Sequence, residues 1–269
     1  MKKEKIDVSK KDGLELYFEK DFNPENKIVA LGFHGLGGIG HLTTRFIVES
    51  ALEQGKGERI GYVIGRMIPP FVEVLDGGRF GFPYELFLIE DKVIMLLIRI
   101  QPWLDDQPIL ADIFTNYAKT NNIKAFVLFG GVDVNVFPER REGDLPLVYI
   151  ANKAFLDNRE YIMPKLNMEA APKGILVSGG ISLFLEYATY RNIPAAAMFS
   201  PTLKGTLDKK GAYNLARKFI ELAGLTVSLT KIKKEIDMTQ KLLESLQGQG
   251  IEPRETRTTG EEDLSHVFT

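Results

Sequence analysis

Three apolar runs, each followed by a pair of glycines, constrain the fold of this chain most strongly. The runs cover residues 27–33, 124–129 and 173–178, and the pairs are Gly37-Gly38, Gly130-Gly131 and Gly179-Gly180. A nearly continuous apolar run of this length is typical of a strand buried on both faces, as in a parallel sheet covered by helices. The three runs therefore predict strands of an α/β sheet whose carboxyl ends carry glycine turns.

Helical and hairpin patterns alternate between these runs. Apolar residues recur at helical spacing in residues 41–54, 105–121 and 208–223. Two further runs, residues 84–89 and 93–100, are separated by a short polar turn and predict an antiparallel hairpin. We therefore expect one α/β domain over residues 1–224, with a mixed, largely parallel sheet flanked by helices.

A heptad pattern begins after Gly224. Apolar residues follow one another at steps of four and three, with polar Thr239 in the middle, and the expected oligomerisation residues are Leu225, Leu229, Ile232, Ile236, Leu243 and Leu246. This narrow seam predicts a C-terminal helix over residues 225–247 that meets copies of itself or a partner. The alternative is a terminal helix that packs on its own domain.

The last segment, residues 248–269, is rich in Gly, Thr, Arg and Glu and has few apolar residues before its end. Such a composition predicts a flexible tail. The chain nevertheless finishes with Val267, Phe268 and Thr269. Because exposed apolar side chains at the end of a polar tail are costly unless they dock, we expect these three residues to bind a partner.

Composition excludes several classes of function. The chain has 34 basic and 36 acidic residues, so its formal net charge of -2 gives no drive toward nucleic acid or anionic membranes. It has no cysteine and three histidines, which leaves little material for a metal site. The longest apolar stretch, residues 93–98, is far shorter than a membrane span. We expect a soluble cytoplasmic protein without a cofactor.

One motif keeps an enzymatic alternative open. Residues 35–40 read GLGGIG, which fits the dinucleotide-binding pattern between a strand and a helix. A nucleotide- or nucleoside-binding α/β enzyme would use this turn to hold a phosphate at the helix N-terminus. However, the next predicted strand ends at Arg66, where a ribose-binding acid is expected. The glycines are equally suited to closing a tight turn between packed backbones.

Four residues near the glycine turns are candidates for catalysis, namely His34, His41, Asp133 and Ser178. No two of them have a recognised catalytic spacing, and Ser178 lacks the glycine elbow of serine hydrolases. The two histidines are seven residues apart and have no helical carboxylate between them. This arrangement is not a metal-binding motif. We therefore expect a protein that is not an enzyme, with a pocket at the strand ends as a remnant.

Several segments together resemble the proteasome assembly chaperone family. They are the glycine-rich turn at residues 32–40, the strand that runs into Gly130-Gly131, and residues 174–180 (GILVSGG) followed by a helix and Asn192-Ile193-Pro194. The similarity spans residues 25–223. The resemblance implies an α/β domain related in shape to nucleoside phosphorylases but without their catalytic groups. It also implies that archaeal members form homo-oligomers.

The resemblance extends to the C-terminus. Some archaeal relatives end in a hydrophobic-tyrosine-any motif that inserts between subunits of the outer ring of the proteasome core, and Val267, Phe268 and Thr269 match it with the phenol hydroxyl missing. We therefore expect an ATP-independent homo-oligomer, a tetramer or pentamer, that binds the proteasome core particle or its precursors through its tails. A hetero-oligomeric scaffold with a paralogous subunit is the other alternative.

Overall fold

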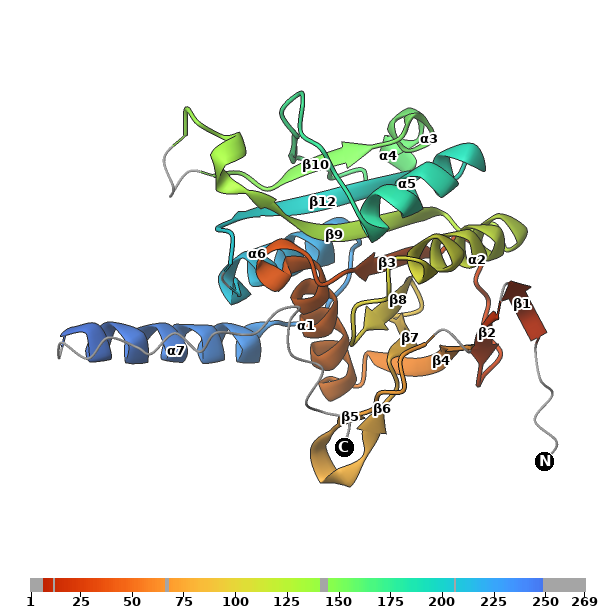
Figure 1. Ribbon diagram of the computed structural model, residues 1–269, viewed down its shortest axis with the longest axis horizontal. Coiled ribbons are helices and arrows are strands. Elements are labelled where there is room, and N and C mark those ends of the chain that lie inside the picture. Colours follow the sequence, from red (N-terminus) through yellow and green to blue (C-terminus); the bar gives the residue numbers. More distant parts are fainter. Residues whose placement is uncertain (1–6, 12, 66–67, 141–144, 206, 249–269) are drawn as a thin grey trace. The chain divides into compact units, whose positions relative to one another are not determined.

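One ten-stranded sheet forms the centre of the protein. The computed structural model describes residues 7–11, 13–65, 68–140, 145–205 and 207–248. The strands are β1 (Asp7–Lys11), β2 (Leu14–Phe18), β3 (Ile28–Gly32), β4 (Gly57–Gly65), β7 (Tyr84–Ile89), β8 (Val93–Ile98), β9 (Ala125–Asp133), β10 (Val148–Ala151), β11 (Glu169–Ala170) and β12 (Ala195–Thr202). Their order across the sheet is β1-β2-β4-β7-β8-β3-β9-β12-β10-β11 (Figure 1). Two short strands, β5 (Glu73–Val74) and β6 (Phe80–Gly81), pair separately.

The centre of the sheet is parallel, and antiparallel pairs lie on both sides of it. Strands β8, β3, β9 and β12 run in the same direction, whereas β10 runs against β12 and β7 runs against both β4 and β8. The hairpin of β7 and β8 agrees with the sequence prediction. A mixed, mostly parallel sheet flanked by helices is therefore confirmed as the fold class.

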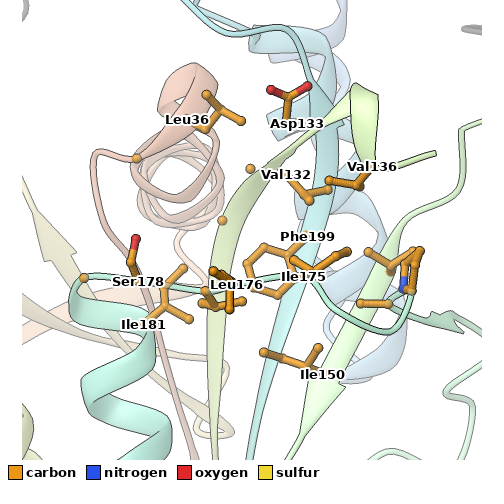
Figure 2. A pocket seen from close by; sticks show the side chains of 18 of the residues that line it. Leu36, Val132, Asp133, Val136, Ile150, Ile175, Leu176, Ser178, Ile181 and Phe199 are labelled. Carbon is orange, nitrogen blue, oxygen red and sulfur yellow. The ribbon is translucent and has the colours of Figure 1, made fainter. Parts of the chain in front are cut away.

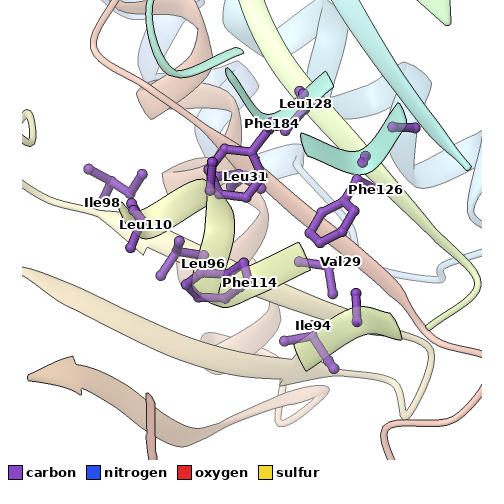
Figure 3. Close-up of a cluster of buried hydrophobic side chains, with 14 of the residues drawn as sticks. Val29, Leu31, Ile94, Leu96, Ile98, Leu110, Phe114, Phe126, Leu128 and Phe184 are labelled. Carbon is purple, nitrogen blue, oxygen red and sulfur yellow. The ribbon is translucent and has the colours of Figure 1, made fainter. Parts of the chain in front are cut away.

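Alternate residues of the central strands serve two separate helical layers. Helices α2 (Asp106–Thr120) and α5 (Gly180–Tyr190) pack against each other and share an apolar cluster with residues such as Leu31 and Phe126 (Figure 3). Helices α1 (Ile39–Glu53) and α6 (Lys209–Leu222) also pack together, and Phe219 of α6 meets Phe129 of β9 at 4.9 Å between ring centroids. Because helices cover both faces of the central strands, both sets of alternating side chains are buried, which explains the uninterrupted apolar runs.

The strands on either side of the helix α1 are not neighbours in the sheet. Strand β4 follows α1 and runs in the direction of β3, but β7 and β8 lie between them. The hairpin that follows β4 in the chain thus inserts next to β3. As a result, the strand that comes after the glycine turn is three positions away from it.

The expectation of a strand at residues 173–178 is wrong. This segment is an extended loop between β11 and α5, and Leu176 is 95% exposed. The position beside β9 is taken by β12, so the apolar run cannot join the central parallel strands whose pattern it shares. In addition, β9 continues through Gly130-Gly131 to Asp133 instead of ending at Phe129.

The C-terminal helix starts later than the heptad pattern predicts. Helix α7 covers Thr230–Gly248, while residues 225–229 are extended. Leu225 and Leu229 are buried, and the intervening backbone is held by Glu90, which accepts the Thr226 N–H at 2.8 Å. These two leucines are therefore used inside their own chain. The described residues divide into two compact units, with the boundary between Lys231 and Ile232.

The remaining seam positions lie on α7. Ile232 is buried and Ile236 is half-buried, whereas Met238 and Leu242 are exposed. Leu243 and Leu246 belong to the helix, but their side chains lie outside the described set. Within the residues that the structure describes, no helix has the length and apolarity needed to cross a membrane.

Two short helices and three 3-10 turns complete the described chain. They are α3 (Lys153–Asp157), α4 (Arg159–Ile162), η1 (Leu36–Gly38), η2 (Asp76–Gly78) and η3 (Val134–Val136).

The junction of α1 with β3 and β9 generates a prediction about stability. A Cβ atom on Gly40 would lie 2.7 Å from the carbonyl oxygen of Phe33 and even closer to that of Phe129. Since neither backbone can move aside easily, Gly40→Ala should lower the free energy of unfolding by about 3 kcal/mol. Gly35→Ala is the matched control, because its Cβ meets no atom within 4 Å. Chemical unfolding monitored by circular dichroism measures both, and equal stabilities would contradict the close-packing account.

Candidate binding pocket

A cavity of about 820 Å³ opens at the carboxyl ends of β3 and β9. The glycine turns of the sequence converge there, since Gly35, Gly130-Gly131 and Gly179-Gly180 all line it. The loop of residues 171–179 crosses its mouth (Figure 2). Two of the three glycine pairs thus line one pocket, whereas Gly37-Gly38 does not, and the third segment is a loop.

Most of the pocket wall is apolar. Phe199 of β12 and Ile150 of β10 contribute from the sheet, Ile181 from the start of α5, and Ile175 from the crossing loop (Figure 2). A Cβ on Gly130 would lie 2.7 Å from Ile181 and 3.0 Å from Phe199. Glycine at this position therefore lets the wall residues close over β9. A wall of this kind suits apolar groups with few specific polar contacts.

His34 and His41 form a stacked pair beside the pocket. Their ring centroids are 4.0 Å apart with an interplanar angle of 19°. Burial, followed by the neighbouring His41 and Arg45, lowers the pKa of His34 to about 3. The pKa of His41 is lowered mainly by burial, although its Nδ1–H donates to the carbonyl oxygen of Ile98 at 2.8 Å. Both rings are therefore neutral at physiological pH.

The four catalytic candidates do not form a catalytic set. His34, Asp133 and Ser178 line the pocket, whereas His41 does not. Asp133 accepts the backbone N–H of Asn135 at 2.8 Å and so caps the turn η3. In the described part of the chain, no hydrogen bond joins any two of His34, Asp133 and Ser178, and no group of three metal-ligating side chains comes together. The arrangement positions no nucleophile against a base.

The chain itself fills the place where a dinucleotide would bind. A Cβ on Gly37 would lie 2.7 Å from Thr202 Oγ1, and one on Gly38 would lie 2.6 Å from Leu207. The backbone N–H of Asp208 donates to the carbonyl of Gly37 at 2.9 Å. The segment after β12 thus covers the N-terminus of α1. In addition, the strand that would supply a ribose-binding acid is three positions away, and Arg66 lies outside the described residues.

Two parts of this edge of the sheet were not predicted from the sequence. The pocket wall comes from strands and loops far apart in the chain, so no local signal marks it. The hairpin of β5 and β6 was also overlooked, although residues 76–78 (DGG) are a turn signal between its strands. The expected partner-binding residues Val267, Phe268 and Thr269 lie outside the described residues.

The buried histidine pair predicts a pH dependence of stability. The pKa of His34 falls from 6.5 to about 3 on folding, so below pH 6.5 the unfolded chain takes up a proton that the folded chain does not. Stability is then full above pH 6.5 and is lost as the pH falls, by up to about 1.4 kcal/mol per pH unit. Between pH 7 and pH 5, urea unfolding of His34→Asn should show a loss about 2 kcal/mol smaller than that of the unmodified chain. Equal losses would show that His34 is protonated in the folded state.

Comparison with known proteins places the fold. The PAC2 family model matches residues 29–247. A structure of Pyrococcus furiosus PbaA, an archaeal homolog of proteasome-assembly chaperone, is 20% identical with a TM-score of 0.74, and the match covers 89% of this chain and 93% of that chain. A structure of Pyrococcus furiosus PbaB, an archaeal proteasome activator, is 13% identical with a TM-score of 0.69, covering 88% of this chain and 100% of that chain.

A Thermoplasma acidophilum protein of unknown function has the same fold, at 17% identity and a TM-score of 0.65, with 85% of this chain and 88% of that chain covered. No curated protein matches this chain. The low identities to the solved structures establish the likeness of fold alone. The family model, however, spans most of the chain and confirms the resemblance found in the sequence. The protein therefore belongs to the PAC2 family.

Proposed function

We propose that this protein is an ATP-independent assembly factor that binds the proteasome core particle or its precursors. The observation that carries the proposal is the PAC2 family match over residues 29–247. The likeness in fold to PbaA and PbaB, whose descriptions name proteasome assembly and proteasome activation, supports it. The pocket fits this role because it has no converging acid, base or nucleophile among its described residues.

The C-terminal residues Val267, Phe268 and Thr269 are the proposed contact with the core particle. About twenty residues separate them from the end of α7, which gives a flexible coil a reach of about 25 Å and a taut limit of roughly 70 Å. Burial of one phenylalanine side chain contributes only about 1.5 to 3 kcal/mol, so one tail binds weakly. Several tails on one oligomer would raise the avidity by roughly 10²- to 10⁴-fold.

Self-association through α7 is the proposed source of several tails. Leu225, Leu229 and Ile232 are buried, so the seam that we propose for another copy consists of Ile236, Leu243 and Leu246. A tetramer or pentamer is the expected assembly, and a paralogous subunit is the alternative partner for the same helix. The role requires no cofactor.

Deletion of residues 267–269 tests the proposed contact. The truncated protein should no longer comigrate with a purified proteasome core in native gels, because the apolar residues at the C-terminus are removed. Its oligomer size and thermal stability should stay unchanged. Phe268→Tyr is the conservative control and should retain or strengthen binding, since it adds a hydroxyl to the same ring. Comigration of the truncated protein would instead assign recognition to the α/β body.

Substitution of the seam tests self-association through α7. Ile236→Asp places a charge in the apolar seam and should shift the assembly toward smaller species in native mass measurements, with a loss of roughly tenfold or more in association constant. Lys234→Asp is the matched control, because Lys234 is an exposed residue of the same helix. If both variants remain fully assembled, α7 does not hold the copies together.

A further inference from the structure

An apolar arm projects from the carboxyl end of β4. The hairpin of β5 and β6 joins β4 to β7 and pairs with no strand of the main sheet (Figure 1). Val74 and Phe80 lie opposite each other on it and are 81% and 54% exposed. Phe71 and Val72, just before the hairpin, are also exposed. A two-stranded hairpin that exposes apolar side chains on its strands is unfavourable in water unless another surface covers them.

The base of the arm is fixed, so its tip cannot fold down onto the sheet. Arg99 of β8's end is only 6% exposed and forms ion pairs with Glu73 of the arm and with buried Glu85, the latter at 2.6 Å. Arg45 of α1 contacts the same Glu73 at 2.9 Å. A Cβ on Gly81 would collide with the guanidinium of Arg99, so the arm backbone lies directly over that group. The tip is thus held in a defined position.

The loop at the mouth of the pocket has backbone groups without hydrogen-bond partners among the described residues. The backbone N–H and C=O groups of Leu176 and Val177 form no hydrogen bond with any other described residue. The run around them has the apolar, β-branched composition of a strand, and Leu176 is 95% exposed. A segment whose backbone groups are unpaired can accept an added strand, because both its backbone groups and the Leu176 side chain are available.

The arm and the pocket lie at the same edge of the sheet but on opposite flanks. The arm leaves the sheet at β4 and β7, whereas the pocket lies over β9, β12 and β10, with β8 and β3 between them. At about 4.8 Å per strand, the two are roughly 20 Å apart. Since the arm is anchored at its base, it does not reach the pocket of its own chain.

We infer that the arm of one copy inserts into the pocket of a second copy. Val74 and Phe80 enter the apolar wall of the partner, and a free edge of the hairpin pairs with residues 175–178. The arm carries no net charge that would favour an ionic partner, because Glu73 is paired and Asp76 and Arg79 are of opposite sign. The charged residues of the pocket lining, Asp133 and Lys173, are also of opposite sign. When the protruding group and the cavity lie at different places on one molecule, copies associate head to tail. Such a heterologous contact builds either a closed ring or an open filament. The inference deepens the proposed self-association and is independent of tail binding.

The test uses two full-length variants that each lose one half of the contact. Val74→Ser with Phe80→Ser removes the apolar tip, and Leu176→Asp blocks the mouth of the pocket. All three side chains are exposed, so folding should be retained. Both variants also carry Ile236→Asp, so that the seam of α7 does not contribute. Leu156→Asp in the same background is the matched control, because Leu156 is an exposed leucine on α3.

Mixing the two variants gives the decisive result. In analytical ultracentrifugation, each variant alone should associate about 10- to 100-fold more weakly than the control. An equimolar mixture should form a one-to-one dimer, because the pocket variant still has an intact arm and the arm variant still has an intact pocket. Monomers in the mixture, or unimpaired association of either variant alone, would overturn the inference. Neither outcome affects comigration with a proteasome core, which depends on the tail.

Discussion

The close contact of α1 with two strands at glycine positions is the constraint on which the rest of the structure depends. Gly32 and Gly40 face each other so closely that a Cβ on Gly32 would overlap the backbone of Gly40. Because neither glycine has a side chain, the N-terminus of α1 can lie directly against the backbones of β3 and β9. The same shortage of space places Thr202 against Gly37. The GLGGIG turn, which resembles a phosphate-binding loop, is therefore filled by packing contacts. The pocket lies beside this turn.

A run of alternating charges crosses the antiparallel wing and gives it a fixed shape. Glu85 is 2% exposed and pairs with both Arg99 and Arg59, and Arg59 reaches Glu19 on β2's end at 3.1 Å. Removal of one member would leave its neighbour charged and buried, which costs several kcal/mol. Such networks add little to net stability but restrict the arrangement of the elements that they join. Here they fix strands of the wing and the root of the arm to one another.

The buried central strands of this fold could be predicted from the sequence, whereas several segments at the edges of the sheet could not. The runs at residues 28–32 and 93–98 are fully buried strands, because apolar patterning reports burial on two faces directly. Residues 173–178 have the same pattern and form a loop, since pairing depends on which edges other strands have already taken. The heptad after Gly224 failed in a similar way at its start, where Leu225 and Leu229 alternate in an extended segment. The pocket was predicted only as a meeting of glycine turns, and its apolar wall has no signature in any single stretch of sequence.

The extended segment before α7 also has a consequence for how the body is used. Thr226 is held by Glu90 in the turn before β8, and Ser228 is held by Gln54 at the end of α1, so the root of the helix is tied to the amino edge of the sheet. The pocket and the arm occupy the carboxyl edge. Each edge can then accumulate substitutions without altering the geometry of the other.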